Sequence, residues 1–320
     1  MNTCEQIIEK TGILPVINIT HQEAALPLSD VLLEEQIGVI EVTLRSSCSL
    51  EAIKTIKSNH SNMLVGAGTV LTIDQVNNAV DAGADFIVLP GFDEEIVDYC
   101  LNKNIPVFPG CVTPSEIQRG IKKGLHTFKF FPSEQNGGID ALKLLSGPFP
   151  NIKFLPTGGI SFDNLENYLS KKFISACGGS FMATANQIKN RDFENIRNSC
   201  RKAMKISLGF KLAHVGINCN DENEALKEAK KLSVLFGFDI SNVGKSVFSE
   251  KYAEFMKVPY YGKNGHIGFY TNSVKRALAY FEQNSIEIIN ESIGTDEKGE
   301  PEFAYLKEQI GGFAIHIVQK

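Results

Sequence analysis

The stretch 38–45 carries ionisable side chains on one face of a predicted strand. Glu41, Thr43 and Arg45 alternate with apolar residues at positions 40, 42 and 44. Successive side chains of a strand point to opposite faces, and the apolar face is the one that covering helices would bury. We therefore expect a carboxylate, a hydroxyl and a guanidinium to point together into the interior of the fold.

A lysine holds the corresponding place in the stretch 126–131. Lys129 and Phe131 share one face there, opposite two further phenylalanines. Burial and a nearby cation, such as Arg45, favour the neutral amine of a lysine, which is a nucleophile. Such an amine condenses with a ketone to an iminium, which accepts electrons when the C3–C4 bond breaks, and Glu41 would move the protons. A buried salt bridge without catalytic function is the alternative interpretation.

Two glycine-containing segments end the next two predicted strands. They are Thr157, Gly158 and Gly159, and Gly178, Gly179 and Ser180. Small residues at the carboxyl ends of these strands expose backbone N–H groups, and barrels commonly hold phosphate there. A glycine pair is also found in ordinary loops. Two such pairs facing an inward lysine favour an anion site.

Predicted strands and helices alternate regularly along the part of the chain that holds these side chains. Helical segments such as 51–60 and 73–83 separate eight β-rich runs. The runs are 13–19, 38–44, 63–68, 84–90, 105–110, 126–131, 152–159 and 173–179. Strands alternating with helices indicate an α/β fold, and the count of eight predicts a (β/α)₈ TIM barrel over residues 1–205. A doubly wound open sheet is the alternative.

The alternation of strands and helices ends with a lysine-rich helical segment at 192–205, and an internal repeat follows. The sequence KLAHVGIN at 211–218 recurs as NGHIGFYT at 264–271, so that His214 and His266 are 266 − 214 = 52 residues apart. Helix-like runs follow at 224–238 and 274–288, and each is succeeded by further strands. This internal repeat predicts a smaller α+β domain over 211–320, built of two βαβββ modules.

Net charge, hydrophobic segments and cysteine spacing indicate which kinds of partner the protein binds and where it is located. The chain has 320 residues and a formal net charge of −5, which argues against nucleic acid. The amino terminus lacks an apolar signal segment, and no stretch has the apolar length of a membrane span. The seven scattered cysteines form no C-x-x-C pair, which favours reduced thiols. We expect a cytoplasmic protein that binds neither nucleic acid nor membranes.

Most of residues 10–185 resembles the 2-keto-3-deoxy-6-phosphogluconate (KDPG) aldolase family, whose members are also called 4-hydroxy-2-oxoglutarate aldolases. Six motifs carry this resemblance. They are GVIEVTLRS (38–46), VGAGTVL (65–71), FKFFPSEQNGG (128–138), LSGPF (145–149), LPTGGIS (155–161) and CGGS (177–180).

The resemblance implies a role for each matching residue. Lys129 would be the Schiff-base lysine and Glu41 the general acid/base. Arg45 and Thr69 would lie in the pyruvate pocket, with Arg45 pairing with the carboxylate. Pro90 and Phe131 would shape that pocket. The phosphate end of the substrate would be surrounded by Thr157, Gly158, Gly159, Gly178, Gly179 and Ser180.

Activity and assembly follow from the same resemblance. The expected reaction cleaves the 2-oxo acid 2-dehydro-3-deoxy-6-phosphogluconate to pyruvate and glyceraldehyde 3-phosphate in sugar-acid catabolism, without a cofactor, in a homotrimer. The alternative substrates are 4-hydroxy-2-oxoglutarate and 2-dehydro-3-deoxy-6-phosphogalactonate. The sequence departs from the family at Asn18, where some relatives carry arginine, and at Leu89, where serine is usual.

The repeat after residue 210 resembles the vicinal oxygen chelate superfamily, which includes glyoxalases. His214 and His266 match its first-strand ligand positions, and Glu254 and His316 are candidates for the last-strand positions. These donors suit a divalent ion such as Zn²⁺, Ni²⁺, Mn²⁺ or Fe²⁺. The alternatives are histidines that only pack, or a metal-free module that binds a ligand and regulates the barrel. The second module is longer, which we attribute to a polar loop at 293–303.

Overall fold

The structure is a computed structural model that describes residues 3–320. It divides into two compact units, Met1–Ser207 and Leu208–Lys320. Each unit has its own hydrophobic interior. Within residues 3–320, the helices fall short of the length and apolar character needed to span a membrane.

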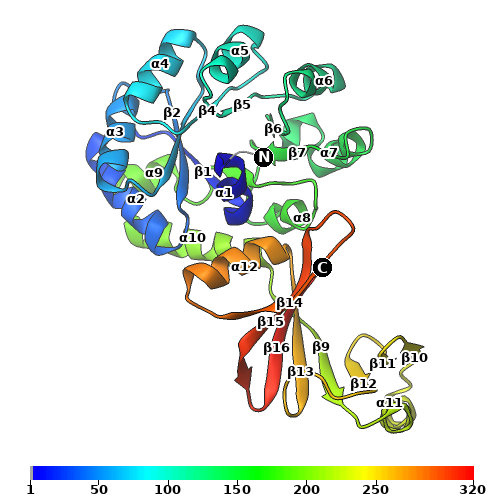
Figure 1. The fold of residues 1–320 in the computed structure, drawn as a ribbon. Coiled ribbons are helices and arrows are strands. Elements are labelled where there is room, and N and C mark those ends of the chain that lie inside the picture. The colour runs from blue at the N-terminus through cyan, green and yellow to red at the C-terminus, as the bar shows by residue number, and fades with distance from the viewer. Residues whose placement is uncertain (1–2) are drawn as a thin grey trace. The chain divides into compact units, whose positions relative to one another are not determined.

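Eight parallel strands form a closed barrel in the first unit (Figure 1). They are β1 (Ile13–Ile17), β2 (Val39–Thr43), β3 (Leu64–Gly68), β4 (Phe86–Val88), β5 (Val107–Phe108), β6 (Thr127–Phe130), β7 (Lys153–Pro156) and β8 (Cys177–Gly179). Six of them form a sheet in the order β5-β4-β3-β2-β1-β8, and β6 pairs with β7. Single bridges join the two sheets at both edges, Gly110 to Lys129 and Thr157 to Gly178. The prediction of a (β/α)₈ barrel is confirmed, and the open sheet is excluded.

Helices surround these strands in the ribbon (Figure 1). They are α1 (Thr3–Thr11), α2 (Ala25–Glu34), α3 (Ser49–Asn59), α4 (Ile73–Asp81), α5 (Glu94–Asn102), α6 (Pro114–Lys122), α7 (Gly138–Ser146), α8 (Leu165–Leu169), α9 (Ala185–Lys189) and α10 (Phe193–Leu208), with short 3₁₀ turns η1 (Gln22–Ala24) and η2 (Glu134–Asn136). Capping residues explain where several of these helices begin. Thr72 and Asp93 accept backbone N–H groups of α4 and α5, and Thr113 with Glu116 forms a capping box on α6.

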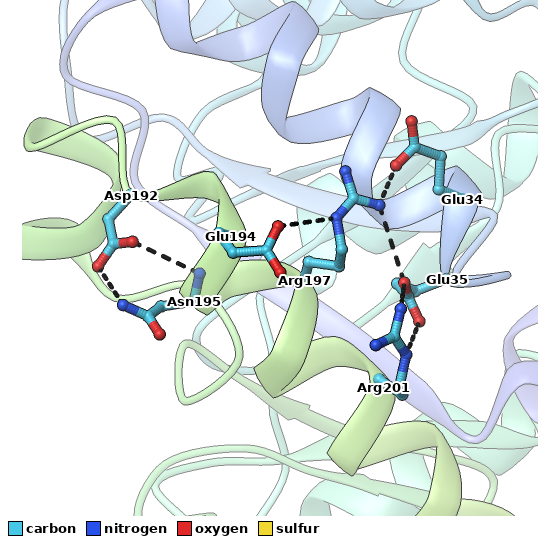
Figure 2. Close-up of polar contacts among 7 residues, drawn as sticks. All are labelled: Glu34, Glu35, Asp192, Glu194, Asn195, Arg197 and Arg201. Atoms are coloured by element: carbon cyan, nitrogen blue, oxygen red, sulfur yellow. Dashed lines mark hydrogen bonds and ion pairs between the residues drawn. The ribbon is translucent and has the colours of Figure 1, made fainter.

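Ion pairs fasten α10 to α2 (Figure 2). Arg197 contacts Glu34 and lies 3.8 Å from Glu35, and Arg201 binds Glu35 at 2.7 Å. Arg197 also pairs with Glu194 in its own helix. Glu34, Glu194 and Arg201 are more than half exposed, and exposed ion pairs add little stability. They therefore offer neutral positions for control substitutions.

Two βαβββ modules build the second unit, as predicted. The first contains β9 (Lys211–Asn218), α11 (Glu222–Phe236), β10 (Ile240–Val243), β11 (Ser246–Ser249) and β12 (Ala253–Met256). The second contains β13 (Gly265–Thr271), α12 (Val274–Gln283), β14 (Ile288–Thr295), β15 (Pro301–Ile310) and β16 (Phe313–Gln319). One eight-stranded sheet results, in the order β10-β11-β12-β9-β13-β16-β15-β14. The modules join where β9 pairs antiparallel with β13.

Two local predictions in this unit were wrong. The helix-like run 274–288 ends as a helix at Gln283, because Ser285 adopts a positive φ of 56° and Ile288 already begins β14. The polar loop predicted at 293–303 is mostly strand, since β14 extends to Thr295 and β15 begins at Pro301. Only the short turn 296–300 separates the two strands. The second module is therefore longer than the first mainly because its strands β14 and β15 are longer.

Candidate active site and candidate metal site

Lys129 and Glu41 meet inside the barrel, although they are 88 residues apart in the chain. Lys129 Nζ lies 3.2 Å from Glu41 Oε1, and the two residues are 5% and 0% exposed. Lys129 Nζ also lies 5.3 Å from the centre of the Phe131 ring. The second carboxylate oxygen, Oε2, is buried and has no hydrogen-bond partner in the part of the chain that is described. This oxygen can therefore still accept a hydrogen bond or a proton.

A glycine on the neighbouring strand makes room for this carboxylate. Gly68 on β3 pairs with Thr43 on β2, and a Cβ added at Gly68 would lie 2.1 Å from Glu41 Oε1. Any other residue at position 68 would displace the carboxylate. The other glycine of the motif VGAGTVL, Gly66, makes room for Phe86 in the same way, since a Cβ there would lie 2.1 Å from that ring.

A cavity of about 380 Å³ lies near this pair, because its lining includes Thr43 and Phe131, which stand two residues after Glu41 and Lys129 in the chain. Its lining includes the predicted residues Arg45, Phe131, Thr157, Gly158, Gly159, Gly179 and Ser180. Asn18 also lines the cavity, and its side-chain oxygen is buried without a partner among residues 3–320. The cavity thus has a guanidinium in its wall and two glycine segments, as an anionic molecule would need.

Five of the predicted barrel residues lie outside the lining of this cavity. They are the buried pair Lys129 and Glu41, and Thr69, Pro90 and Gly178. Thr69 directly follows β3 and has a φ of 58°, a conformation that strains a β-branched residue and that often marks functional sites. Pro90 lines a separate hollow of about 230 Å³ with Leu71 and Phe92. Gly178 pairs with Thr157, whose Oγ1 a Cβ at position 178 would meet at 2.3 Å.

Residues 4–199 match the family model described as KDPG and KHG aldolase. The chain belongs to this family. The barrel is therefore an aldolase, a carbon–carbon lyase, and its lysine-containing interior has the groups that aldol chemistry through a Schiff base requires.

Curated relatives of the KDPG and KHG aldolase family align with nearly their whole length. The 2-dehydro-3-deoxy-phosphogluconate aldolase of Haemophilus influenzae is 38% identical over 207 residues, which are 64% of this chain and 98% of the relative. The KHG/KDPG aldolase of Escherichia coli K12 is 38% identical over 203 residues, which are 63% and 95% of the two chains.

A solved family structure shows the chemistry in a relative. The KDPG aldolase of Legionella pneumophila, which holds pyruvate captured at low pH as a covalent carbinolamine intermediate, is 37% identical. It superposes with a TM-score of 0.62 and covers 63% of this chain and 98% of its own. That protein forms a covalent bond with pyruvate, which an aldolase of the Schiff-base class would do.

Sequence reasoning missed one wall of the aldolase cavity. The apolar residues of this wall are Val16, Ile160, Ala183, Ala185 and Ile188. The last two belong to α9, a five-residue helix that the strand pattern did not reveal. Its signal was the capping box, because Thr184 and Gln187 satisfy each other's backbone N–H groups.

The second unit gathers three histidines and a carboxylate at the centre of its sheet. His214 Nε2 lies 3.1 Å from His266 Nε2 and 3.2 Å from His316 Nε2. Glu254 Oε2 lies 3.2 Å from His214 Nε2 and 3.2 Å from His266 Nε2. A ring nitrogen carries at most one proton, so His214 Nε2 cannot donate to three neighbours at once. Converging lone pairs of this kind suit a cation.

The spacing of these donors fits a metal ion. Nitrogen and oxygen donors about 2.0–2.1 Å from a tetrahedral Zn²⁺ are about 3.3 Å apart, close to the four separations just given, and the ligand atoms of the three histidines all lie within 4.8 Å of one another. Burial, and then the charges of His266 and His214, lower the pKa of His316 to about 3, which keeps its imidazole neutral. Burial by itself raises the pKa of Glu254, but hydrogen bonds with His214 and His266 lower it well below its usual range. Neutral imidazoles and an ionised carboxylate are the forms that bind metals.

Two glycines let the four side chains converge. Gly216 on β9 lies in register between Glu254 and His266, and Gly268 on β13 lies between His214 and His316. A Cβ at Gly216 would lie 2.1 Å from His266 Cε1, and one at Gly268 would lie 2.5 Å from His316 Nε2. The H-x-G pattern of both repeats is therefore a packing requirement of the cluster.

Proposed function

We propose that the barrel cleaves 2-dehydro-3-deoxy-6-phosphogluconate to pyruvate and glyceraldehyde 3-phosphate through a Schiff base on Lys129. The observation that carries this proposal is the buried contact of Lys129 with Glu41 beside a cavity that Arg45 and two glycine segments line. The relatives named above act on this substrate by name.

The proposed mechanism gives each of these groups one step. The amine of Lys129 adds to the C2 ketone, and loss of water gives an iminium. Glu41 takes the proton of the C4 hydroxyl, and the C3–C4 electron pair moves into the iminium to form an enamine as glyceraldehyde 3-phosphate leaves. Glu41 then returns a proton to C3, and water releases pyruvate from Lys129. Arg45 pairs with the C1 carboxylate.

Substrate preference tests the assignment of the phosphate end. We expect the phosphorylated substrate to be cleaved with a kcat/KM about 10- to 100-fold above that of 2-dehydro-3-deoxygluconate, because charge-assisted hydrogen bonds hold the phosphate. Coupled measurement of pyruvate release checks this with both substrates and with 4-hydroxy-2-oxoglutarate. A higher kcat/KM for 4-hydroxy-2-oxoglutarate would identify the alternative substrate as the correct one.

We propose in addition that the second unit binds one divalent metal ion through His214, Glu254, His266 and His316. A glyoxalase-like, vicinal oxygen chelate fold is the proposed relationship, supported by the two βαβββ modules and by ligand positions on their first and last strands. Ser246 donates to Glu254 Oε1 at 2.6 Å, and the Tyr305 ring stacks on His316. Such supporting contacts hold ligands in place.

Substituting Gly268 with alanine is expected to weaken metal binding at least about tenfold, because the new methyl group displaces His316 and His214. Titration of the full-length protein with Co²⁺ or Zn²⁺, followed by visible absorption and calorimetry, measures the affinity. Gly38→Ala is the matched control, since a Cβ there meets nothing within 4 Å. Failure of the unsubstituted protein to bind either ion, or equal affinity in Gly268→Ala, would contradict the proposed site.

Two further expectations from the sequence stay predictions. They are a homotrimer, as the family resemblance implies, and a cytoplasmic location. Analytical ultracentrifugation of the full chain measures the first, and cell fractionation the second.

A further inference from the structure

The segment after Phe131 packs against the glycine pair of the aldolase cavity. The backbone N–H of Ser133 donates to the carbonyl of Thr157 at 2.8 Å, and that of Glu134 donates to the carbonyl of Gly158 at 3.2 Å. A Cβ added at Gly159 would lie 2.5 Å from Glu134 Cγ. The stem of an acidic side chain therefore touches a residue that lines the proposed anion site.

A buried tyrosine holds the end of this acidic side chain. Tyr168 on α8 is 1% exposed, and its hydroxyl donates to Glu134 Oε1 and lies 3.1 Å from Ser133 Oγ. Burial, followed by the hydrogen bond to Glu134, raises the pKa of Tyr168, so the hydroxyl keeps its proton. Glu134 is not among the residues that line the cavity. Its carboxylate is thus fixed outside the cavity while its stem adjoins the wall.

The last glycine of the segment PSEQNGG serves the same contact. Gly138 has a φ of 56°, and a Cβ there would lie 2.9 Å from Glu134 Oε1 and 3.0 Å from Tyr168 Oη. The aldol chemistry itself uses none of these groups. The segment 128–138 therefore contains two groups of residues. The first includes Lys129, and the second, Glu134 with Gly138, fits closely around the hydroxyl of Tyr168.

We propose that Tyr168 is a positioning residue that keeps the carboxylate of Glu134 away from the anion-binding end of the cavity. The inference rests on the proposed function, which places the substrate phosphate at Gly158 and Gly159. A released carboxylate next to Gly159 competes for the same backbone N–H groups and repels the phosphate. The hydroxyl of Tyr168 thus sets affinity for the anionic end and leaves the chemistry at Lys129 untouched.

Tyr168→Phe tests this by separating binding from chemistry. We expect the KM for the phosphorylated substrate to rise about tenfold, because Glu134 loses the hydrogen bond that holds its carboxylate and then competes with the phosphate, with kcat within about twofold. The exchange of pyruvate C3 hydrogens with deuterated water, which needs no phosphate, should stay at the wild-type rate. Tyr99→Phe is the matched control, because it removes a surface hydroxyl bound to Asn77, and it should change neither measurement.

A second substitution distinguishes positioning from mere packing. Glu134→Gln removes the charge, so the double variant Tyr168→Phe with Glu134→Gln should return the KM to within about twofold of wild type. Gly138→Ala, which displaces both partners, should raise the KM in the same way and should also be rescued by Glu134→Gln. The double variants therefore report on the charge and not on packing.

Three outcomes would overturn the inference. A KM that stays raised in both double variants would show that Glu134 is not the competing charge. A Tyr168→Phe protein whose pyruvate exchange falls as much as its cleavage would show a structural role only. Absence of pyruvate exchange in the wild-type protein would remove the proposed function and this inference with it.

Discussion

Replacing Lys129 with arginine is expected to abolish aldol cleavage in a protein that remains folded. The guanidinium stays protonated and forms no Schiff base, so kcat/KM should fall at least about 10⁴-fold. A cation nevertheless remains beside Glu41, which is fully buried. Lys129→Ala removes the cation as well, and an unpaired buried carboxylate should lower the free energy of unfolding by about 3–5 kcal/mol.

Pyruvate release and thermal unfolding, measured on both variants, separate these effects. Lys123→Arg is the control for the substitution itself, because Lys123 pairs with Asp98 on the barrel surface. It should leave cleavage at the wild-type rate. Cleavage by Lys129→Arg within about 100-fold of wild type would show that another group carries the reaction.

Replacing Glu41 with glutamine should lower both cleavage and pyruvate C3 exchange by about 10²- to 10⁴-fold, the usual contribution of a general acid/base. The amide still contacts Lys129 but cannot carry a proton, and the free Oε2 of Glu41 is the atom we assign to proton transfer. Schiff-base formation with pyruvate should persist, because Lys129 is unchanged.

NMR measures the exchange of the pyruvate C3 hydrogens, and mass spectrometry measures the Schiff-base adduct. Glu34→Gln is the matched control, since Glu34 forms a surface pair with Arg197 (Figure 2). Exchange at the wild-type rate in Glu41→Gln would assign the proton transfer elsewhere and leave the Lys129–Glu41 contact as a structural ion pair.

The direction of the central side chains could be predicted from local patterns. The period-two alternation around Glu41 and Lys129 indicated that both point inward, and the structure places them 3.2 Å apart. Strand positions were also found, although the runs were longer than the strands: 84–90 contains only Phe86–Val88 as β4. The residues on either side of β4 still bond to the neighbouring strands, since the N–H of Asp85 donates to the carbonyl of Val65 and that of Leu89 to the carbonyl of Phe108, but they lie outside the strand itself.

Contacts that depend on loops escaped sequence reasoning. Tyr168 and Glu134 are 34 residues apart, and no pattern in either segment indicates the other. Pro90 lies in a different hollow from Arg45, because the path of a loop after a strand depends on its packing. The N-terminal helix α1 was missed as well, although Cys4, Ile8 and Thr11 follow a helical spacing and are buried.

The repeat predicted the second unit better than any single residue did. Two copies of one module imply a shared sheet, and equivalent strands place His214 and His266 side by side. The glycines opposite them were visible in the sequence as H-x-G, but their purpose needed the strand register. Register between distant strands cannot be derived from either strand alone.

Borohydride trapping with pyruvate tests the central claim most directly. The full-length protein is incubated with pyruvate and sodium borohydride, digested and analysed by peptide mass spectrometry, beside Lys129→Arg. We predict a stable pyruvate adduct on the peptide that contains Lys129, and none in the variant. An unmodified wild-type protein, or an adduct on a different lysine, would contradict the assignment of Lys129 as the Schiff-base residue.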